Sequence, residues 1–216
     1  MFAGEKIPSG IQEYAATAQN LETKEEIYSA MVVYGLLTYD NGMVSIPNRE
    51  LMGSYAAMMK KEKSLGYVYR LANISYRMLQ ATLEKDIETM QDIIQYAHNT
   101  ETPILSYNNE TELSALVNLV YLSARDWYRI EREDKAGKGY VDFIFYPLRR
   151  NQDCIILELK VNHTPEEAIS QIKEKEYALR FTGKLAENLK YTGRILAVGI
   201  SYNKETKEHF CKVEEL

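Results

Sequence analysis

The sequence predicts an α/β fold in which a helical N-terminal region precedes a small mixed sheet flanked by helices. Residues 23–99 carry capping signals and apolar residues at helical spacing, whereas short apolar runs typical of strands follow from about residue 127. Between those runs, one segment with strong capping signals predicts a helix within the sheet domain. The change of pattern near residues 99–109 divides the chain into a helical region 1–103 and an α/β domain 104–216.

The first region is expected to be mostly helical. Thr23 and Glu26 form a capping box at the start of a helix 23–39. Asn41-Gly42 then predicts a turn. The later elements expected here are a short extended piece 43–47, a helix 48–63 capped by Asn48, and one long or two shorter helices within 65–100.

The second region alternates helices with short apolar runs. The helix 163–181 has the clearest signals, because Thr164 can cap it, Pro165 suits its first position and Glu167 completes a capping box. In chain order we expect a helix 110–124, a strand 127–133, two strands on either side of the loop 147–153, the helix 163–181, and strands 193–203 and 209–216.

The composition limits the class of protein. The 216 residues are 45% hydrophobic and 26% charged, which is typical of an ordinary soluble globular protein. No apolar run is long enough to span a bilayer, and the start lacks the pattern of a signal peptide.

Cys154 and Cys211 have neither metal-ligand spacing nor a disulfide framework, so we expect a cytoplasmic protein with reduced core cysteines. The net charge of −5 argues against a broadly basic nucleic-acid coat, but a nuclease needs only a locally positive cleft.

Two apolar runs contain charges that a core strand does not need. Asp142 lies among Val, Phe and Ile, and Glu158 and Lys160 interrupt the following run. If the loop 147–153 is symmetric about Arg150, residues whose numbers add up to 300 face each other across a hairpin, which puts Asp142 opposite Glu158. Lys160 lies two residues beyond Glu158 and therefore on the same face.

Two carboxylates placed in this way predict a metal site. They repel each other, and one tends to keep a proton unless a cation lies between them. Mg²⁺ prefers oxygen ligands and is usually held by one or two carboxylates together with waters and substrate phosphates. The alternative is a structural salt-bridge cluster on a solvated sheet face, although Ile144 and Ile156 on that face would sit poorly in water.

The order Asp142, a turn, and then Glu158-Leu159-Lys160 resembles the D…(D/E)xK signature of the PD-(D/E)XK nuclease superfamily. The stretches "GKGYVDFIFY", "IILELKV", "TPEEAISQIKEKEYALRF" and "GRILAVGISYNKETK" are similar to the nuclease domain that follows an AAA-like ATPase domain in many bacterial proteins of uncharacterised role. The resemblance covers about 104–216. It implies a restriction-endonuclease-like mixed sheet flanked by helices.

The resemblance also implies roles for the signature residues. Asp142 and Glu158 would bind Mg²⁺, or Mn²⁺ in its place, with the main-chain carbonyl of Leu159 as a third ligand. Lys160 would orient or activate the attacking water and stabilise charge on the phosphate. Metal ion and ammonium group together would neutralise the charge that develops at phosphorus, and the metal would lower the pKa of a bound water.

Further residues are expected around the signature. Gln171 matches a glutamine often found on the next helix, and Lys175 shares its face, so both could reach a phosphate or the active-site water, unless Lys175 is merely solvated. Tyr177 matches a tyrosine of the relatives, for which core packing is the simpler interpretation. The superfamily also places a glutamate on an early helix, and Glu110 fits that place better than its competitor Glu112.

The three histidines give no pattern of a metal or triad site. His163 adjoins the N-terminus of the capped helix, which suits a turn residue at least as well as a ligand. His98 and His209 have no partner pattern in the sequence.

Residues 1–103 lack the phosphate-binding loop G-x-x-x-x-G-K-[ST] of an ATPase. The stretch "VSIPNRE" (44–50) resembles the segment that closes the ATPase domain in the relatives. The resemblance therefore implies the remnant or trailing helices of such a domain, without nucleotide binding, which could dock on an ATPase domain or another protein.

The leading hypothesis is a Mg²⁺-dependent nuclease that hydrolyses phosphodiester bonds of nucleic acid, DNA more than RNA, through a metal-activated water. The alternative is a catalytically inactive nuclease-fold module that binds nucleic acid or protein. The acidic net charge favours this alternative, as do Glu112 and Ser114, where relatives usually carry an aromatic residue and a histidine.

Overall fold

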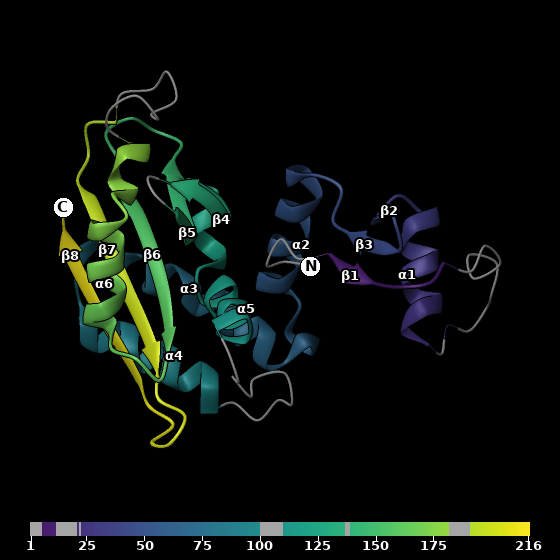
Figure 1. Cartoon of the computed structure of the whole chain (residues 1–216). Helices are drawn as coiled ribbons and strands as arrows, with labels where there is room; N and C mark the ends of the chain where they lie inside the picture. The colour runs from purple at the N-terminus through teal and green to yellow at the C-terminus, as the bar shows by residue number, and fades with distance from the viewer. Residues whose placement is uncertain (1–5, 12–20, 22, 100–109, 137–138, 182–190) are drawn as a thin grey trace. The chain divides into compact units, whose positions relative to one another are not determined.

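A computed structural model of the chain describes residues 6–11, 21, 23–99, 110–136, 139–181 and 191–216 (Figure 1). The chain forms two compact units, Met1–Lys61 and Glu62–Leu216. No helix within the described ranges is both long enough and apolar enough to cross a membrane.

The first unit combines a small antiparallel sheet with two helices. Its strands have the order β1-β3-β2. The elements are β1 (Ile7–Pro8), α1 (Lys24–Val33), β2 (Thr38–Asp40), β3 (Met43–Ser45) and α2 (Arg49–Lys61).

The first helix is shorter than the sequence predicted. Its capping box forms as expected, but α1 ends at Val33 instead of residue 39. Gly35 follows with a φ of 71°, and Tyr39 pairs with Val44 across the turn at Asn41-Gly42. Strand pairing therefore takes residues 38–40 out of the helix, which local propensity could not indicate.

The second unit is built on a five-stranded mixed sheet with the order β4-β5-β6-β7-β8. Its strands are β4 (Tyr128–Ala136), β5 (Gly139–Pro147), β6 (Cys154–Val161), β7 (Ile195–Tyr202) and β8 (His209–Glu215). Among these strands β6 and β7 are parallel, and the neighbours β4–β5, β5–β6 and β7–β8 are antiparallel. The predicted mixed sheet is confirmed, and both cysteines are buried thiols.

Helices pack on both faces of this sheet (Figure 1). One face shares a large buried cluster with three helices, and the other shares a smaller one with a single helix. The three helices are α3 (Tyr67–Glu84), α4 (Ile87–Asn99) and α5 (Glu110–Val120), and the single one is α6 (Pro165–Glu174). Leu71 and Ile94 belong to the large cluster, and Ile169 and Ile172 to the small one.

The boundary between the compact units lies after Lys61 and not near residue 103. The sequence placed α3 and α4 with the N-terminal region, but their apolar faces are buried with the sheet. Gln91 of α4 also donates a hydrogen bond to the carbonyl of His209 in β8, at 3.0 Å. Periodicity identified the two helices but could not say which core buries them.

Two helices of the second unit end earlier than predicted. The helix expected over 110–124 is α-helical to Val120, and a 3-10 turn follows. The helix expected over 163–181 ends at Glu174, because Glu176 adopts a left-handed conformation with a φ of 56°. In the described part of this unit, 3-10 turns are found at Lys63–Leu65, Leu122–Asp126 and Tyr177–Arg180.

The hairpin of β5 and β6 has the predicted register. Phe143 pairs with Leu157, and Ile144 pairs with Ile156, so the numbers of paired residues add up to 300. Ile144 and Ile156 are fully buried under α6, which excludes a solvated sheet face at this point. The pairing of β5 with β6 begins at Phe143, so Asp142, the preceding residue in the chain, lies just outside the ladder.

Helix α6 lies close to β7 at Gly199. A Cβ atom added at Gly199 would lie 2.3 Å from the carbonyl oxygen of Pro165 and 3.1 Å from the Cβ of Ala168. Only a glycine leaves room for the first turn of α6 at this distance. The contact fixes the helix that carries Gln171 over the strand that neighbours β6.

Candidate active site

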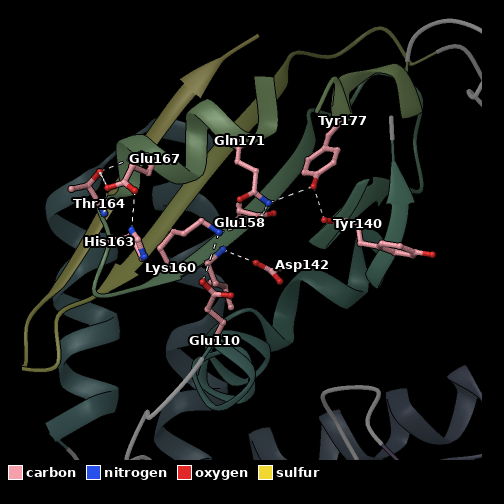
Figure 2. Close-up of polar contacts among 11 residues, drawn as sticks. Glu110, Tyr140, Asp142, Glu158, Lys160, His163, Thr164, Glu167, Gln171 and Tyr177 are labelled. Carbon is pink, nitrogen blue, oxygen red and sulfur yellow. Dashed lines mark hydrogen bonds and ion pairs between the residues drawn. The ribbon is translucent and has the colours of Figure 1, made fainter. Parts of the chain in front are cut away.

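Glu158 lies at the centre of the polar cluster on β6 (Figure 2). Its side chain is only 4% exposed. The carboxylate oxygen Oε1 accepts a hydrogen bond from Lys160 Nζ at 3.2 Å and another from Gln171 Nε2 of α6. Alternation along the strand puts Glu158 and Lys160 on one face, as the sequence predicted, and α6 covers this face.

Asp142 reaches the same strand from β5. Its Oδ2 accepts a hydrogen bond of 2.7 Å from the backbone N–H of Leu159. This contact forms where the β5–β6 ladder has ended, so the side chain takes the place of a main-chain partner. The N–H and C=O of a strand residue point toward the same neighbour, so the carbonyl of Leu159 also faces the β5 side.

Glu110 approaches Lys160 from the start of α5 (Figure 2). Its carboxylate lies 3.7 Å from the Lys160 ammonium, which thus stands between Glu110 and Glu158. Glu110 is about half exposed, whereas the Lys160 side chain is mostly covered. This ion pair places Glu110, the early-helix candidate that the sequence favoured, beside the signature lysine.

A second polar connection links Gln171 to β5. The Gln171 amide lies 3.5 Å from the hydroxyl of Tyr177, which donates a hydrogen bond of 2.5 Å to the carbonyl of Tyr140. Tyr177 is buried, as expected of a core residue. Its hydroxyl is nevertheless part of the site, because it accepts from the same Gln171 amide nitrogen that donates to Glu158 and so holds that nitrogen toward Glu158.

Burial dominates the electrostatics of the acid pair. Desolvation, followed by the negative charge of Asp142, raises the pKa of Glu158 to about 7. Desolvation also raises the pKa of Asp142, while the Leu159 N–H and Lys160 lower it. The two acids therefore influence each other, and a cation between them would be stabilised by both.

A groove of about 450 Å³ opens beside these residues. Lys175, predicted to contact substrate, lies on its wall as the C-terminal cap residue of α6 and is exposed. The groove is lined by Glu110, Lys160, His163, Glu167, Ser170, Gln171, Glu174 and Lys175. The two lysines and Gln171 are therefore accessible from one solvent-filled space.

The donor set fits a hard divalent cation. The second carboxylate oxygen of Glu158, Oε2, is buried and has no hydrogen-bond partner in the described part of the chain. A buried carboxylate oxygen without a partner is costly, and a cation would satisfy it. Within the same described ranges no group of three or more His, Cys, Asp or Glu side chains is arranged around a common point. Two carboxylates with waters and substrate oxygens are the usual Mg²⁺ pattern.

Comparison with protein families finds a match for this part of the chain. Residues 108–209 match the PD-(D/E)XK nuclease superfamily. The match contains every predicted site residue from Glu110 to Lys175 and all five strands at least in part. Enzymes of this superfamily generally use divalent metals, in agreement with the oxygen donors found here. No curated protein and no solved structure matches the chain.

Sequence patterns did not reveal two contacts of this site. Tyr177 follows Gln171 by six residues, which would separate them on a continuous helix. The left-handed Glu176 breaks the helix and turns Tyr177 back. The second contact joins His163 Nδ1 to Glu167 Oε2 at 2.9 Å, and its only sequence signal is the i,i+4 spacing.

Proposed function

We propose that this protein is a metal-dependent nuclease that hydrolyses phosphodiester bonds of nucleic acid, DNA in preference to RNA. Mg²⁺ is the proposed cofactor, and Mn²⁺ can replace it. The observation that carries the proposal is the buried Glu158 with an unpartnered Oε2 in the described region, beside Asp142 and Lys160. Such an arrangement is costly as scaffolding and suited to cation binding.

Asp142 and Glu158 would hold the metal ion, with the carbonyl of Leu159 as an additional ligand. The bound ion would supply a Lewis acid and a water of lowered pKa. Lys160 contributes the fixed positive charge next to the reacting phosphate, where it stabilises charge on the phosphate oxygens and orients the attacking water. Glu110 holds this ammonium from the far side, because its carboxylate lies 3.7 Å away.

Gln171 orients the acid that it contacts. Its Nε2 donates to Glu158 Oε1, so its own carbonyl oxygen is turned away from that carboxylate and can accept a hydrogen bond from the attacking water. Tyr177 keeps this orientation. Lys175, on the wall of the groove, contributes a positive charge for a more distant part of the nucleic-acid backbone.

The test is cleavage of a panel of labelled DNA and RNA substrates, single- and double-stranded, in Mg²⁺, Mn²⁺ or EDTA. We expect cleavage that requires the metal ion and that leaves a 5′-phosphate. Asp142→Ala and Lys160→Ala should each lower the rate by about 100-fold or more. The matched control is Lys173→Ala, whose lysine pairs with Glu214 at 2.5 Å outside this groove. Activity that survives both site variants, or wild-type protein that cleaves no substrate, would end the proposal.

One observation favours a second candidate, a nuclease-fold module without turnover. The Lys160 ammonium lies within ion-pair distance of both Glu158 and Glu110 and so already compensates these acids. This candidate predicts no measurable binding of Mg²⁺ or Mn²⁺. Calorimetric titration of wild type and Glu158→Gln distinguishes the two, because binding that depends on Glu158 contradicts the inactive module.

A further inference from the structure

His163 forms part of the wall of the groove beside Lys160 (Figure 2). It lies in the turn between β6 and α6, directly after Asn162, which has a left-handed φ of 60°. Asn162 is held by a hydrogen bond from its N–H to the carbonyl of Tyr202 and by one from the N–H of Lys204 to its side chain. The turn that presents His163 is therefore fixed to the end of β7.

Glu167 fixes the imidazole itself. Its Oε1 accepts from the backbone N–H and the hydroxyl of Thr164, both at 3.3 Å, as part of the capping box. Its Oε2 is thereby positioned to contact His163 Nδ1 at 2.9 Å. One oxygen of the Glu167 carboxylate therefore caps the helix, and the other contacts the histidine.

This contact decides what the rest of the ring can do. A carboxylate only accepts, so Nδ1 carries the proton and Nε2 points away from Glu167 (Figure 2). In the imidazolium form of the ring, Nε2–H is a second donor and the ring carries a positive charge. The charged groups that line the groove with His163 are Lys160 of β6, Glu110 of α5, Glu167 and Glu174 of α6, and Lys175 at its end, and Glu110 is paired with Lys160.

The charge of the groove makes a specific donor necessary. Lys160 and Lys175 are balanced by three glutamates on the same wall, so the overall field does not attract an anion strongly. Hydrogen bonds from groups held in place are then the means of binding a phosphate. His163 and Lys160 are donors of this kind, and both are tied to neighbouring carboxylates.

We propose that His163 contacts a backbone phosphate of the nucleic acid next to the cleaved one, with Glu167 holding the imidazole in place. The inference rests on the proposed function, because that function supplies the nucleic acid as the ligand. It assigns a role to a residue outside the D…(D/E)xK signature. His163 binds substrate and takes no part in the bond cleavage. Replacing His163 should therefore change Kd and KM and leave kcat unchanged.

The experiment measures binding of a fluorescein-labelled DNA oligonucleotide by anisotropy, with full-length Asp142→Asn protein in Mg²⁺ so that the DNA stays intact. At pH about 6, adding His163→Gln should weaken binding about 5- to 10-fold. Kinetics of the otherwise unchanged protein should show the same factor in KM at pH about 6, with kcat unchanged.

Glu167→Gln and Glu166→Gln form a matched pair. Each removes one negative charge from neighbouring positions, and the glutamine oxygen at 167 can still accept the capping bonds. Glu166 instead pairs with Lys212, at 3.4 Å. General electrostatics predicts that both changes strengthen DNA binding. The His163 contact predicts that Glu167→Gln weakens it at pH about 6 while Glu166→Gln does not.

The outcomes separate this inference from the proposed function. Equal Kd values for the proteins with and without His163→Gln overturn the contact, even if the wild type cleaves DNA. Binding that depends on His163 in a protein that cleaves nothing supports the contact and removes the nuclease proposal. Absence of any binding to the oligonucleotide overturns the contact.

Discussion

The negative charge of Asp142 is not required for the fold. The Leu159 N–H donates a hydrogen bond to its side chain, and any acceptor oxygen at that position can accept this bond. Asp142→Asn keeps that acceptor and removes the repulsion with Glu158. In EDTA at pH about 8, we expect the variant to be at least as stable as the wild type. Mg²⁺ or Mn²⁺ should raise the melting temperature of the wild type by mass action and leave the variant unchanged. Thermal melts in both conditions check this, and an equal metal response in the two proteins would contradict it.

Glu158 makes stability depend on pH. Its pKa in the folded protein is about 7, against an ordinary value of 4.5, so the folded state binds the proton more tightly. The contribution of Glu158 to the free energy of unfolding is therefore fully present below about pH 4.5 and is lost as the pH rises through about 7. We expect the free energy of unfolding in EDTA to fall by about 2–3 kcal/mol between pH 5 and 7.5. Denaturant titrations should show most of this slope removed in Glu158→Gln, with Glu166→Gln as the unchanged control.

The signature residues could be predicted because their placement depends on strand alternation and on one symmetric loop. Both are local properties, and the register around Arg150 follows from them. The carbonyl of Tyr140 could not be predicted, because it joins the site only through a helix break at Glu176. Main-chain groups and contacts across breaks leave no trace in side-chain patterns.

At the scale of elements, the position of α6 depends on Gly199. Gly199→Ala would force the new methyl against the Pro165 carbonyl, so α6 must shift or β7 must bend. We expect a loss of about 1–3 kcal/mol of stability and, because Gln171 moves with the helix, a lower cleavage rate. Gly53→Ala in α2 is the control, since nothing lies within 4 Å of its added methyl and alanine favours a helix. Circular dichroism melts and cleavage assays check both, and a fully stable, active Gly199→Ala protein would contradict the close packing.

The types of the elements were more predictable than their ends. Capping boxes at Thr23 and Thr164 marked helix starts correctly, because the signal lies within four residues. The ends at Val33 and Glu174 depend on strand pairing and on a left-handed residue. Tertiary contacts decide such ends, and one sequence does not display them.

At the scale of the whole molecule, the unit Glu62–Leu216 should be an independent folding unit. It contains the complete sheet, both buried clusters and every site residue. We expect the fragment 62–216 to melt cooperatively and to keep the metal response. The fragment 104–216 lacks α3 and α4, so it exposes the sheet face that Leu71 and Ile94 cover and should aggregate or bind a hydrophobic dye. Equal melting curves of the two fragments would contradict the boundary after Lys61.

The first unit has features of a docking surface. Several of its large apolar side chains are exposed, including Val33, Tyr34 and Met58. An apolar depression of about 330 Å³ lies among Ile7, Tyr28, Met31, Leu37, Ile46, Tyr55 and Met58. Exposed apolar patches often mark protein contacts. The origin of this unit from an AAA-like ATPase domain stays a prediction, since the family match begins at residue 108.

The register of the β5–β6 hairpin also bears on the order in which the chain folds. Phe143 and Leu157 are close in the chain, whereas Cys154 pairs with Ile195 and Gln91 contacts His209 only after long loops have closed. Contacts between near neighbours in sequence form earlier as a rule. We therefore expect the two acids to meet while water still screens their repulsion. Water would leave Glu158 only when α6 docks, and by then Lys160 and Gln171 are in place to replace it.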